Sequence, residues 1–335
     1  MRKTKTTIIF LLLIIVSLPL YSCQRKYPAK SGTGFYFDTI VSIAIHDNNI
    51  SDKQKSKLLE ECMNMCDYYD KLLSSTITDS DIYAINHANG KSVVVHEDTF
   101  FLIETAVEYA KLTNGRIDPT ISKVSDLWTF RQDNGNIPSQ TDIQDALKHV
   151  DYTKILLDRN NLTVTLLDPD ATIGLGFIAK GFIADKIKDY LLNQSVKNAS
   201  INLGGNLLFL GKHSDGKSFT AGIQMPFSEN GTLAATITLK DKSLVTSGTY
   251  QRYFTVDNII YHHILDTATG MPLNNDLLSV SILTDSSLHA DALSTTCFIM
   301  GLEEGLNYIN SLENVEALFI TSDYQLHYSN GFVQQ

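Results

Sequence analysis

The 335-residue sequence has only four cysteines, and none of them belongs to a C-x-x-C pair. This absence removes the support for a zinc ribbon or a thioredoxin-like redox site. Cys62, Cys66 and Cys297 lie beyond the N-terminal region, and we interpret them as buried free thiols. The sequence also lacks the G-x-S-x-G, H-E-x-x-H and Walker A motifs, so it offers no sign of the enzymes that depend on them.

The sequence also has no excess of basic over acidic residues. The chain has 27 basic and 37 acidic residues, which gives a formal net charge of −10. Nucleic-acid binding needs a positive surface that neutralises phosphates, so we expect no nucleic-acid partner. Prolines number seven and glycines 19, and 43% of the residues are hydrophobic. This composition is that of a globular protein and not of a low-complexity chain.

The N-terminus has the pattern of an export signal. In residues 1–22, basic side chains precede an apolar run that is too short to span a membrane. The residues before Cys23 resemble a bacterial lipobox, although Tyr21 replaces the usual small residue. We therefore predict a lipid on Cys23 that anchors the exported protein to the outer face of a bacterial membrane. A plain signal peptide is the alternative, and residues 23–34 are expected to be a polar tether.

Hydrophobic periodicity divides the rest of the chain into helices and strands. Runs of strands with intervening helices predict an α+β fold with largely antiparallel sheets and packed helices, not a doubly wound sheet. No repeat or linker follows the tether, so residues 35–335 are expected to form one domain. Helices are expected over residues 52–73, 97–113, 141–149, 178–192, 288–300 and 303–312. Strands are expected over 35–45, 199–210, 219–225, 233–239 and 278–284, with hairpins over 154–168 and 252–265 and two C-terminal strands.

A glycine-rich turn at residues 174–179 fits the G-x-G-x-x-A dinucleotide pattern between a strand and a helix. A Rossmann site also needs an acidic residue about 20 positions later, and residues 193–200 contain none. We therefore reject a Rossmann site and expect a simple glycine turn. The helix that follows can still receive a phosphate at its N-terminus, close to Lys180.

Two further patterns carry possible chemistry. Asp291 and Thr295 are four residues apart, so on a helix their oxygens share one face and suit a hard cation such as Mg²⁺. Spacing alone favours the simpler explanation, a capping aspartate and an ordinary threonine. His262 and His263 lie at the end of a predicted strand and point to opposite faces, so they do not easily share one metal. One of them is a candidate base, and two surface histidines are an equally good explanation.

Taken together, these motifs resemble the ApbE family, the FAD:protein FMN transferases. The resemblance covers about residues 35–333 and rests on the order of the motifs as much as on any single one. The last of them, residues 290–295, is similar to the family pattern A-D-A-L-A-T. The other matching segments are 37–39, 79–86, 115–120, 127–130, 173–181, 201–206, 246–252 and 263–270.

The resemblance implies a two-lobed, T-fold-like architecture and a reaction. With Mg²⁺, such an enzyme cleaves FAD, transfers FMN to a Thr or Ser hydroxyl of an exported or membrane flavoprotein, and releases AMP. Two alternatives stay open. With water in place of the acceptor, the protein is an FAD pyrophosphatase that yields FMN and AMP. If it catalyses no reaction, the protein is a flavin-binding lipoprotein.

The resemblance also implies roles for individual residues. Asp291, Thr295 and the backbone oxygen of Phe177 match the Mg²⁺ ligands, and His263 matches a histidine that acts as base on the acceptor hydroxyl. The positions that match cofactor contacts are Phe37, Thr76, Trp128, Thr129, Phe130, Gly174, Lys180, Gly204, Gly205 and Leu265.

Three positions depart from the family pattern. Gly174 stands where the family has an aspartate, Phe177 replaces a glycine, and Thr76 occurs where an aromatic residue often stacks on the cofactor. These departures affect the expected affinity and pose of FAD more than the expected reaction class.

Overall fold

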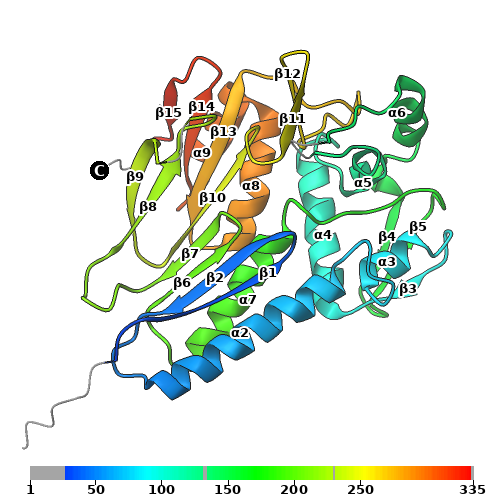
Figure 1. Ribbon diagram of the computed structural model, residues 1–335. Helices are drawn as coiled ribbons and strands as arrows, with labels where there is room; N and C mark the ends of the chain where they lie inside the picture. The colour runs from blue at the N-terminus through cyan, green and yellow to red at the C-terminus, as the bar shows by residue number, and fades with distance from the viewer. Residues whose placement is uncertain (1–26, 131–133, 229–230, 333–335) are drawn as a thin grey trace, which may run out of the picture.

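Figure 1 shows the computed structural model, which describes residues 27–130, 134–228 and 231–332. The predicted signal peptide at residues 1–22 and the predicted lipidation site at Cys23 lie outside the described residues. Among the helices that are described, none is both long enough and apolar enough to span a bilayer.

An antiparallel sheet of eight strands forms the centre of the molecule (Figure 1). Its strand order is β1-β2-β6-β7-β10-β13-β14-β15, and every neighbouring pair is antiparallel. The predicted α+β class with antiparallel sheets is thereby confirmed. The strands are β1 (Lys30–Tyr36), β2 (Thr39–Ile45), β6 (Ala199–Leu203), β7 (Asn206–Leu210), β10 (Lys242–Gly248), β13 (Leu277–Thr284), β14 (Glu316–Thr321) and β15 (Leu326–Tyr328).

Helices cover one face of this sheet, and a hairpin covers the other. Successive residues of a strand point to opposite faces, so Val245 of β10 packs in the core beneath the helices while Leu244 packs beneath the hairpin. The central strands are therefore buried on both sides. The covering elements are α2 (Asp52–Leu72), α7 (Ala179–Asn193), α8 (Ser287–Met300) and α9 (Leu302–Asn310) on one face, and β8 (Phe219–Gln224) with β9 (Leu233–Leu239) on the other.

Smaller elements make up the remainder of the molecule, on the right of Figure 1. A three-stranded sheet has the order β3-β5-β4, and a separate hairpin is formed by β11 and β12. An aromatic core, which contains Trp128 and Phe254, joins this hairpin to helices α5 and α6. The elements are α3 (Asp81–Asn86), β3 (Val93–Val94), α4 (Glu97–Leu112), α5 (Ser122–Ser125), α6 (Gln140–Leu147), β4 (Ile155–Asp158), β5 (Thr163–Leu166), β11 (Tyr253–Val256) and β12 (Ile259–His262).

The predicted strand over residues 35–45 is wrong, because this segment contains a turn. Phe37 and Asp38 have positive φ angles of 55° and 57°, and they reverse the chain between β1 and β2. Two central residues with positive φ match the twist of a two-residue hairpin. The hairpin begins at Lys30, so the last part of the predicted tether belongs to the sheet. Strand β10 was not predicted, because both of its faces are buried and its sequence does not alternate.

Candidate active site

The first turn of α7 packs closely on α8, and this contact positions Asp291. The backbone N–H of Gly181 donates to Asp291 Oδ2 at 2.9 Å. A Cβ atom at Gly181 would lie 2.2 Å from the backbone oxygen of Ser287, so only glycine permits this approach. The glycine after Lys180 therefore fixes the start of α7 against the predicted cation ligand.

Asp291 is a buried carboxylate with few partners. Its side chain is 5% exposed, and the Gly181 amide is its one hydrogen-bond donor within the described residues. Burial raises the pKa of Asp291, while the charge of Lys180 and the Gly181 amide act in the opposite direction. A buried charge needs compensation from a paired charge or a metal, so this carboxylate suits a cation.

Thr295 lies one turn after Asp291 on α8, as the spacing predicts. Its Oγ1 is 3.0 Å from Ser247 Oγ of β10. Phe177, the third predicted ligand, precedes α7, and its ring contacts Tyr109 edge-on. The Tyr109 hydroxyl lies 3.0 Å from Nδ1 of His289, also on α8. The predicted ligands thus come from α8 and from the turn before α7, the helix that packs on α8.

The two adjacent histidines differ in their surroundings: His262 is the last residue of β12, and His263 lies in the bend that follows, not in the strand that the sequence predicts. His262 is 6% exposed, and both of its nitrogens are bonded: Nε2 donates to Leu273 O at 3.1 Å, and Nδ1 accepts from the Ile264 N–H. His263 reaches the surface at one edge, and its Nδ1 lies 3.3 Å from the backbone oxygen of Arg252. A carbonyl only accepts, so Nδ1 carries the proton and Nε2 has a free lone pair.

Electrostatics connect His263 with the α7–α8 contact. Desolvation by the surrounding protein, followed by the charge of Arg252, lowers the pKa of His263 to about 3. Lys180 lowers the pKa of His263 too, and it lowers that of Asp291. One ammonium group therefore acts on both the predicted base and the predicted cation ligand, which places the three in one electrostatic neighbourhood.

Two hairpin turns lie side by side next to these helices. Gly204 and Gly205 have φ angles of +63° and +95° and are exposed between β6 and β7. A Cβ atom at Gly204 would lie 2.4 Å from Thr39, beside the turn that holds Phe37. Asn206 follows the glycines and accepts from Ser287 Oγ of α8 at 2.6 Å. The glycine turn is thus fixed to the start of the helix that holds Asp291.

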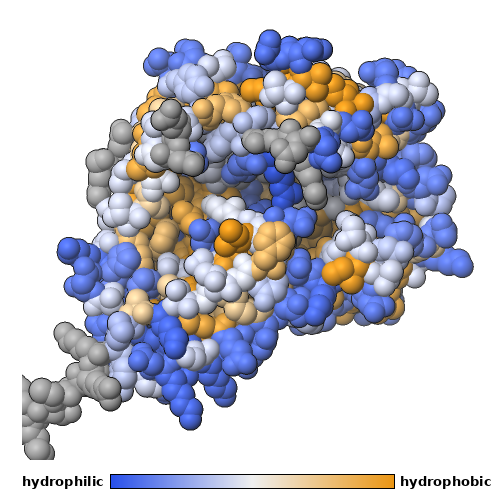
Figure 2. Space-filling model, viewed as in Figure 1, coloured by the Kyte–Doolittle hydropathy of each residue, from blue (hydrophilic) through white to orange (hydrophobic). Residues whose placement is uncertain are grey.

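The β1–β2 hairpin also carries exposed apolar side chains. Phe35 and Ile40 are paired across the two strands and are 69% and 70% exposed. Figure 2 shows apolar side chains over this hairpin with hydrophilic ones around them. At its turn, the Phe37 backbone N–H donates to Asp70 Oδ1 at 3.0 Å, which ties the turn to α2.

Trp128 lies in a packed aromatic core. Its indole is 6% exposed, stacks on Phe130 with ring centres 5.4 Å apart, and donates from Nε1 to Gly270 O at 3.2 Å. Leu265 is 6% exposed in the same core. The indole is thereby held against the turn that follows His263, and its contact with the flavin stays a prediction.

The other predicted cofactor contacts lie in loops. The Gly174 amide donates to Pro119 O at 2.9 Å, and a Cβ atom there would lie 3.0 Å from Ser122 Oγ. Thr129 pairs with Asn136 through an isolated bridge. Thr76 is exposed between α2 and α3, and its hydroxyl contacts Ser74. No contact among the described residues joins Thr76 to Asp291 or His263, so its role stays a prediction.

Asp185 is a structural residue of the site that the sequence analysis missed. Its carboxylate accepts from Ser286 Oγ at 2.9 Å and from the backbone N–H groups of Ser287 and Leu288 at 3.1 and 3.0 Å. An acidic side chain at a helix N-terminus satisfies its free amides. Asp185 belongs to α7 and caps α8, about 100 residues later, so no local pattern reveals this role.

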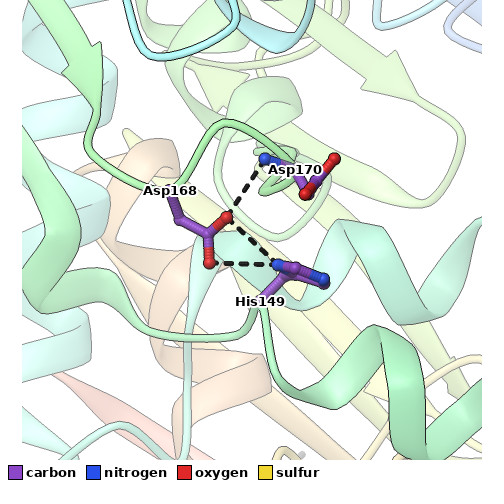
Figure 3. Close-up of side chains that lie close together, drawn as sticks. All are labelled: His149, Asp168 and Asp170. Carbon is purple, nitrogen blue, oxygen red and sulfur yellow. Dashed lines mark hydrogen bonds and ion pairs between the residues drawn. The ribbon is translucent and has the colours of Figure 1, made fainter.

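A separate cluster has a composition that suits metals. His149, Asp168 and Asp170 bring their ligand atoms within 4.8 Å of one another, the only such group within the described segments (Figure 3). The imidazole Nδ1 of His149 lies 3.0 Å from Asp168 Oδ2, and Lys154 Nζ lies 3.7 Å from the same oxygen. The cluster includes none of the predicted ligands, and Lys154 offsets part of its negative charge.

Comparison with known proteins gives consistent results. A model of the ApbE family matches residues 37–319. The FAD:protein FMN transferase of Klebsiella pneumoniae (strain 342) is 36% identical over 256 residues, which cover 76% of this chain and 79% of that protein. The FAD:protein FMN transferase of Treponema pallidum (strain Nichols) is 34% identical over 291 residues, or 83% of this chain and 80% of that protein.

Solved structures show the same likeness. The ApbE protein of Thermotoga maritima has a TM-score of 0.81 at 30% identity and covers 90% of this chain and 97% of its own. The flavin transferase ApbE of Vibrio cholerae has a TM-score of 0.79 at 26% identity, with 91% and 99% covered.

Proposed function

This chain belongs to the ApbE family and is a flavin transferase, and from this premise we propose how its site acts on FAD and an acceptor protein. An acceptor hydroxyl attacks the FMN phosphorus of FAD. The bond from that phosphorus to the bridging oxygen breaks, and AMP leaves with that oxygen. The acceptor proton must go to a base, and a Thr or Ser side chain is the proposed nucleophile.

The state of His263 is the observation that carries this mechanism. Its Nδ1–H is held by the Arg252 carbonyl, so Nε2 is free to accept a proton. His263 is neutral at pH 7, because desolvation and Arg252 lower its pKa to about 3. Both nitrogens of His262 are already bonded, so His263 is the better base.

Bound FAD makes His263 a stronger base. Arg252 and Lys180 are the cations that lower its pKa in the free protein. A diphosphate beside them offsets their charge, so bound FAD removes part of the effect that lowers the pKa of His263, while desolvation, the largest cause, remains. A base works best with a pKa near the operating pH. Substrate binding therefore tunes the residue that accepts the hydroxyl proton.

The chemistry of Asp291 fits a divalent cation. Its carboxylate is buried with a single donor among the described residues, and Thr295 adds an oxygen on the same helix face. We infer that these two residues and the Phe177 carbonyl hold Mg²⁺, which prefers oxygen ligands. The cation, when bound, neutralises the diphosphate and stabilises the charge that develops on it.

We also propose that the protein is a lipoprotein. The support is the sequence before Cys23, which resembles a lipobox and follows an export signal. The fold is compatible with this anchor, because β1 (Lys30–Tyr36), which follows the predicted anchor in the sequence, lies at one edge of the central sheet. A lipid at Cys23 would place the site at the outer face of a membrane, where exported flavoproteins are the available acceptors.

Incubation with FAD, Mg²⁺ and an exported flavoprotein acceptor tests the proposal. We expect flavin on the acceptor after denaturing electrophoresis, with AMP in equal amount. Free FMN with AMP and an unlabelled acceptor would instead indicate a pyrophosphatase, and unchanged FAD would indicate a binding protein. An acceptor in which the target hydroxyl is removed is the matched control.

A further inference from the structure

Ser247 joins a strand of the central sheet to the proposed cation site. Its Oγ, on β10, lies 2.7 Å from Ser294 Oγ and 3.0 Å from Thr295 Oγ1, both on α8. Ser294 Oγ in turn donates to the backbone oxygen of Asp291 at 2.8 Å. These contacts form one continuous chain, which starts at Thr295 and ends on the backbone of the proposed carboxylate ligand.

The direction of this chain follows from counting protons. Each hydroxyl supplies one proton, so three protons serve three contacts. A carbonyl only accepts, so Ser294 gives its proton to the Asp291 backbone oxygen. Ser294 then accepts from Ser247, and Ser247 accepts from Thr295. This is the one assignment that places a proton in every contact, and the reversed direction leaves the carbonyl contact empty.

The direction decides what Thr295 offers to a ligand. Because the Thr295 hydroxyl donates its hydrogen bond to Ser247, the lone pairs of the Thr295 oxygen are free to bind a cation. The neighbouring Thr296 shows the usual alternative, since its hydroxyl donates to Ala292 O, four residues earlier, at 2.8 Å. Without Ser247, Thr295 is free to rotate in the same way toward its own helix backbone.

We propose that Ser247 is a positioning residue that holds the Thr295 hydroxyl as an oxygen donor to the divalent cation. The inference rests on the cation site of the proposed function and adds a residue that touches neither cation nor substrate. Residues that orient metal ligands typically change metal affinity 10–100-fold when they are replaced. A hydroxyl is a weak ligand, so we expect about a tenfold effect for Ser247, the lower end of that range.

The test measures Mn²⁺ binding to the purified protein from the loss of the free Mn²⁺ electron paramagnetic resonance signal. Ser247→Ala should raise the Mn²⁺ dissociation constant about tenfold, which means weaker binding. Ser247→Thr keeps the hydroxyl on a side chain that suits a strand and should restore binding. Thr246→Ala is the matched control, because this neighbouring hydroxyl on β10 contacts Ser281 at 2.7 Å and not α8; it should bind Mn²⁺ to within about twofold of wild type.

A double-mutant cycle shows whether Ser247 acts through Thr295. In a Thr295→Ala background, Ser247→Ala should have no further effect on Mn²⁺ affinity. The proposal is overturned if Ser247→Ala binds Mn²⁺ with wild-type affinity. It is also overturned if Ser247→Ala lowers Mn²⁺ affinity as much in the Thr295→Ala background as in the wild-type background. If Asp291→Ala abolishes binding and Thr295→Ala weakens it in the same series while Ser247→Ala does not, the cation site stands although the role of Ser247 fails. A wild-type protein that binds no Mn²⁺ contradicts both.

In enzyme kinetics, the same variant should raise the Mg²⁺ concentration needed for half-maximal FAD cleavage. The rate at saturating Mg²⁺ should stay close to that of wild type, because the side chain of Ser247 contacts Ser294 and Thr295 and not His263. A variant that merely disturbs the fold would lower the melting temperature and the saturated rate together. A fall in the saturated rate with an unchanged Mg²⁺ requirement would therefore refute the positioning role.

Discussion

Replacing Asp291 with asparagine should make the cation-free protein more stable and nearly inactive. Burial raises the pKa of Asp291 above its unfolded value, so the carboxyl group favours the folded state while it is protonated. That contribution is lost as the pH rises through the folded pKa, so at high pH the buried carboxylate destabilises the fold. Asp291→Asn removes the charge and keeps an oxygen for the Gly181 N–H.

The alanine variant separates the charge from the hydrogen bond. Asp291→Ala leaves the buried Gly181 amide without its 2.9 Å partner, which costs about 1–3 kcal/mol. In domains of 150–250 residues, 1 kcal/mol shifts the melting temperature by about 2–4 °C. The asparagine variant should therefore melt several degrees above the alanine variant. Both should lose about 10³-fold in flavin transfer, if the cation supplies roughly 4 kcal/mol to the transition state.

Thermal melts in EDTA between pH 4 and pH 8, with transfer rates in Mg²⁺, measure both effects. Asparagine and wild-type proteins should differ most at the highest pH and converge as the pH falls, because the raised pKa of Asp291 favours the protonated carboxyl group in the folded state. An asparagine variant that melts below wild type at pH 7 would refute the electrostatic reasoning. A wild-type transfer rate in either variant would remove Asp291 from the site.

The remaining predictions concern the base, the aromatic core and the anchor. His263→Ala should slow transfer roughly 10²–10⁴-fold, the effect of a lost general base, while His262→Ala should be much milder on transfer and lower the melting temperature; equal transfer losses would contradict this. Trp128→Phe removes the hydrogen bond to the Gly270 carbonyl and should destabilise the protein by about 1 kcal/mol, measured in urea; an unchanged stability would show that this hydrogen bond does not stabilise the fold. Cys23→Ser should move the protein from the membrane to the soluble exported fraction; a wild-type protein that is already soluble and unlipidated would refute the anchor.

Local sequence patterns were sufficient to predict part of the candidate site. The spacing of Asp291 and Thr295 places both on one face of α8, as observed, because helix periodicity depends only on neighbouring residues. His262 and His263 have different partners, as expected, although β12 ends at His262 and strand alternation therefore does not explain the orientation of His263. The helices and most strands were predictable from the same local periodicity.

Contacts between distant segments were not predictable. Gly181 and Asp291 meet across 110 residues, and Ser247 and Thr295 across 48. Local sequence patterns do not predict which strand packs against which helix. The turn at Phe37 was missed for another reason, since an aromatic residue with positive φ is rare and the segment has no glycine to mark a turn.

The most direct test of the account is the reaction in ¹⁸O-labelled water. When the acceptor hydroxyl attacks the FMN phosphorus, the new phosphate ester takes its oxygen from the acceptor, and AMP keeps the bridging oxygen. We therefore predict no ¹⁸O in either the acceptor-bound FMN or the released AMP, measured by mass spectrometry. A label in the flavin phosphate would show that water attacks first and that the protein is a pyrophosphatase, and a label in AMP would show attack at the wrong phosphorus.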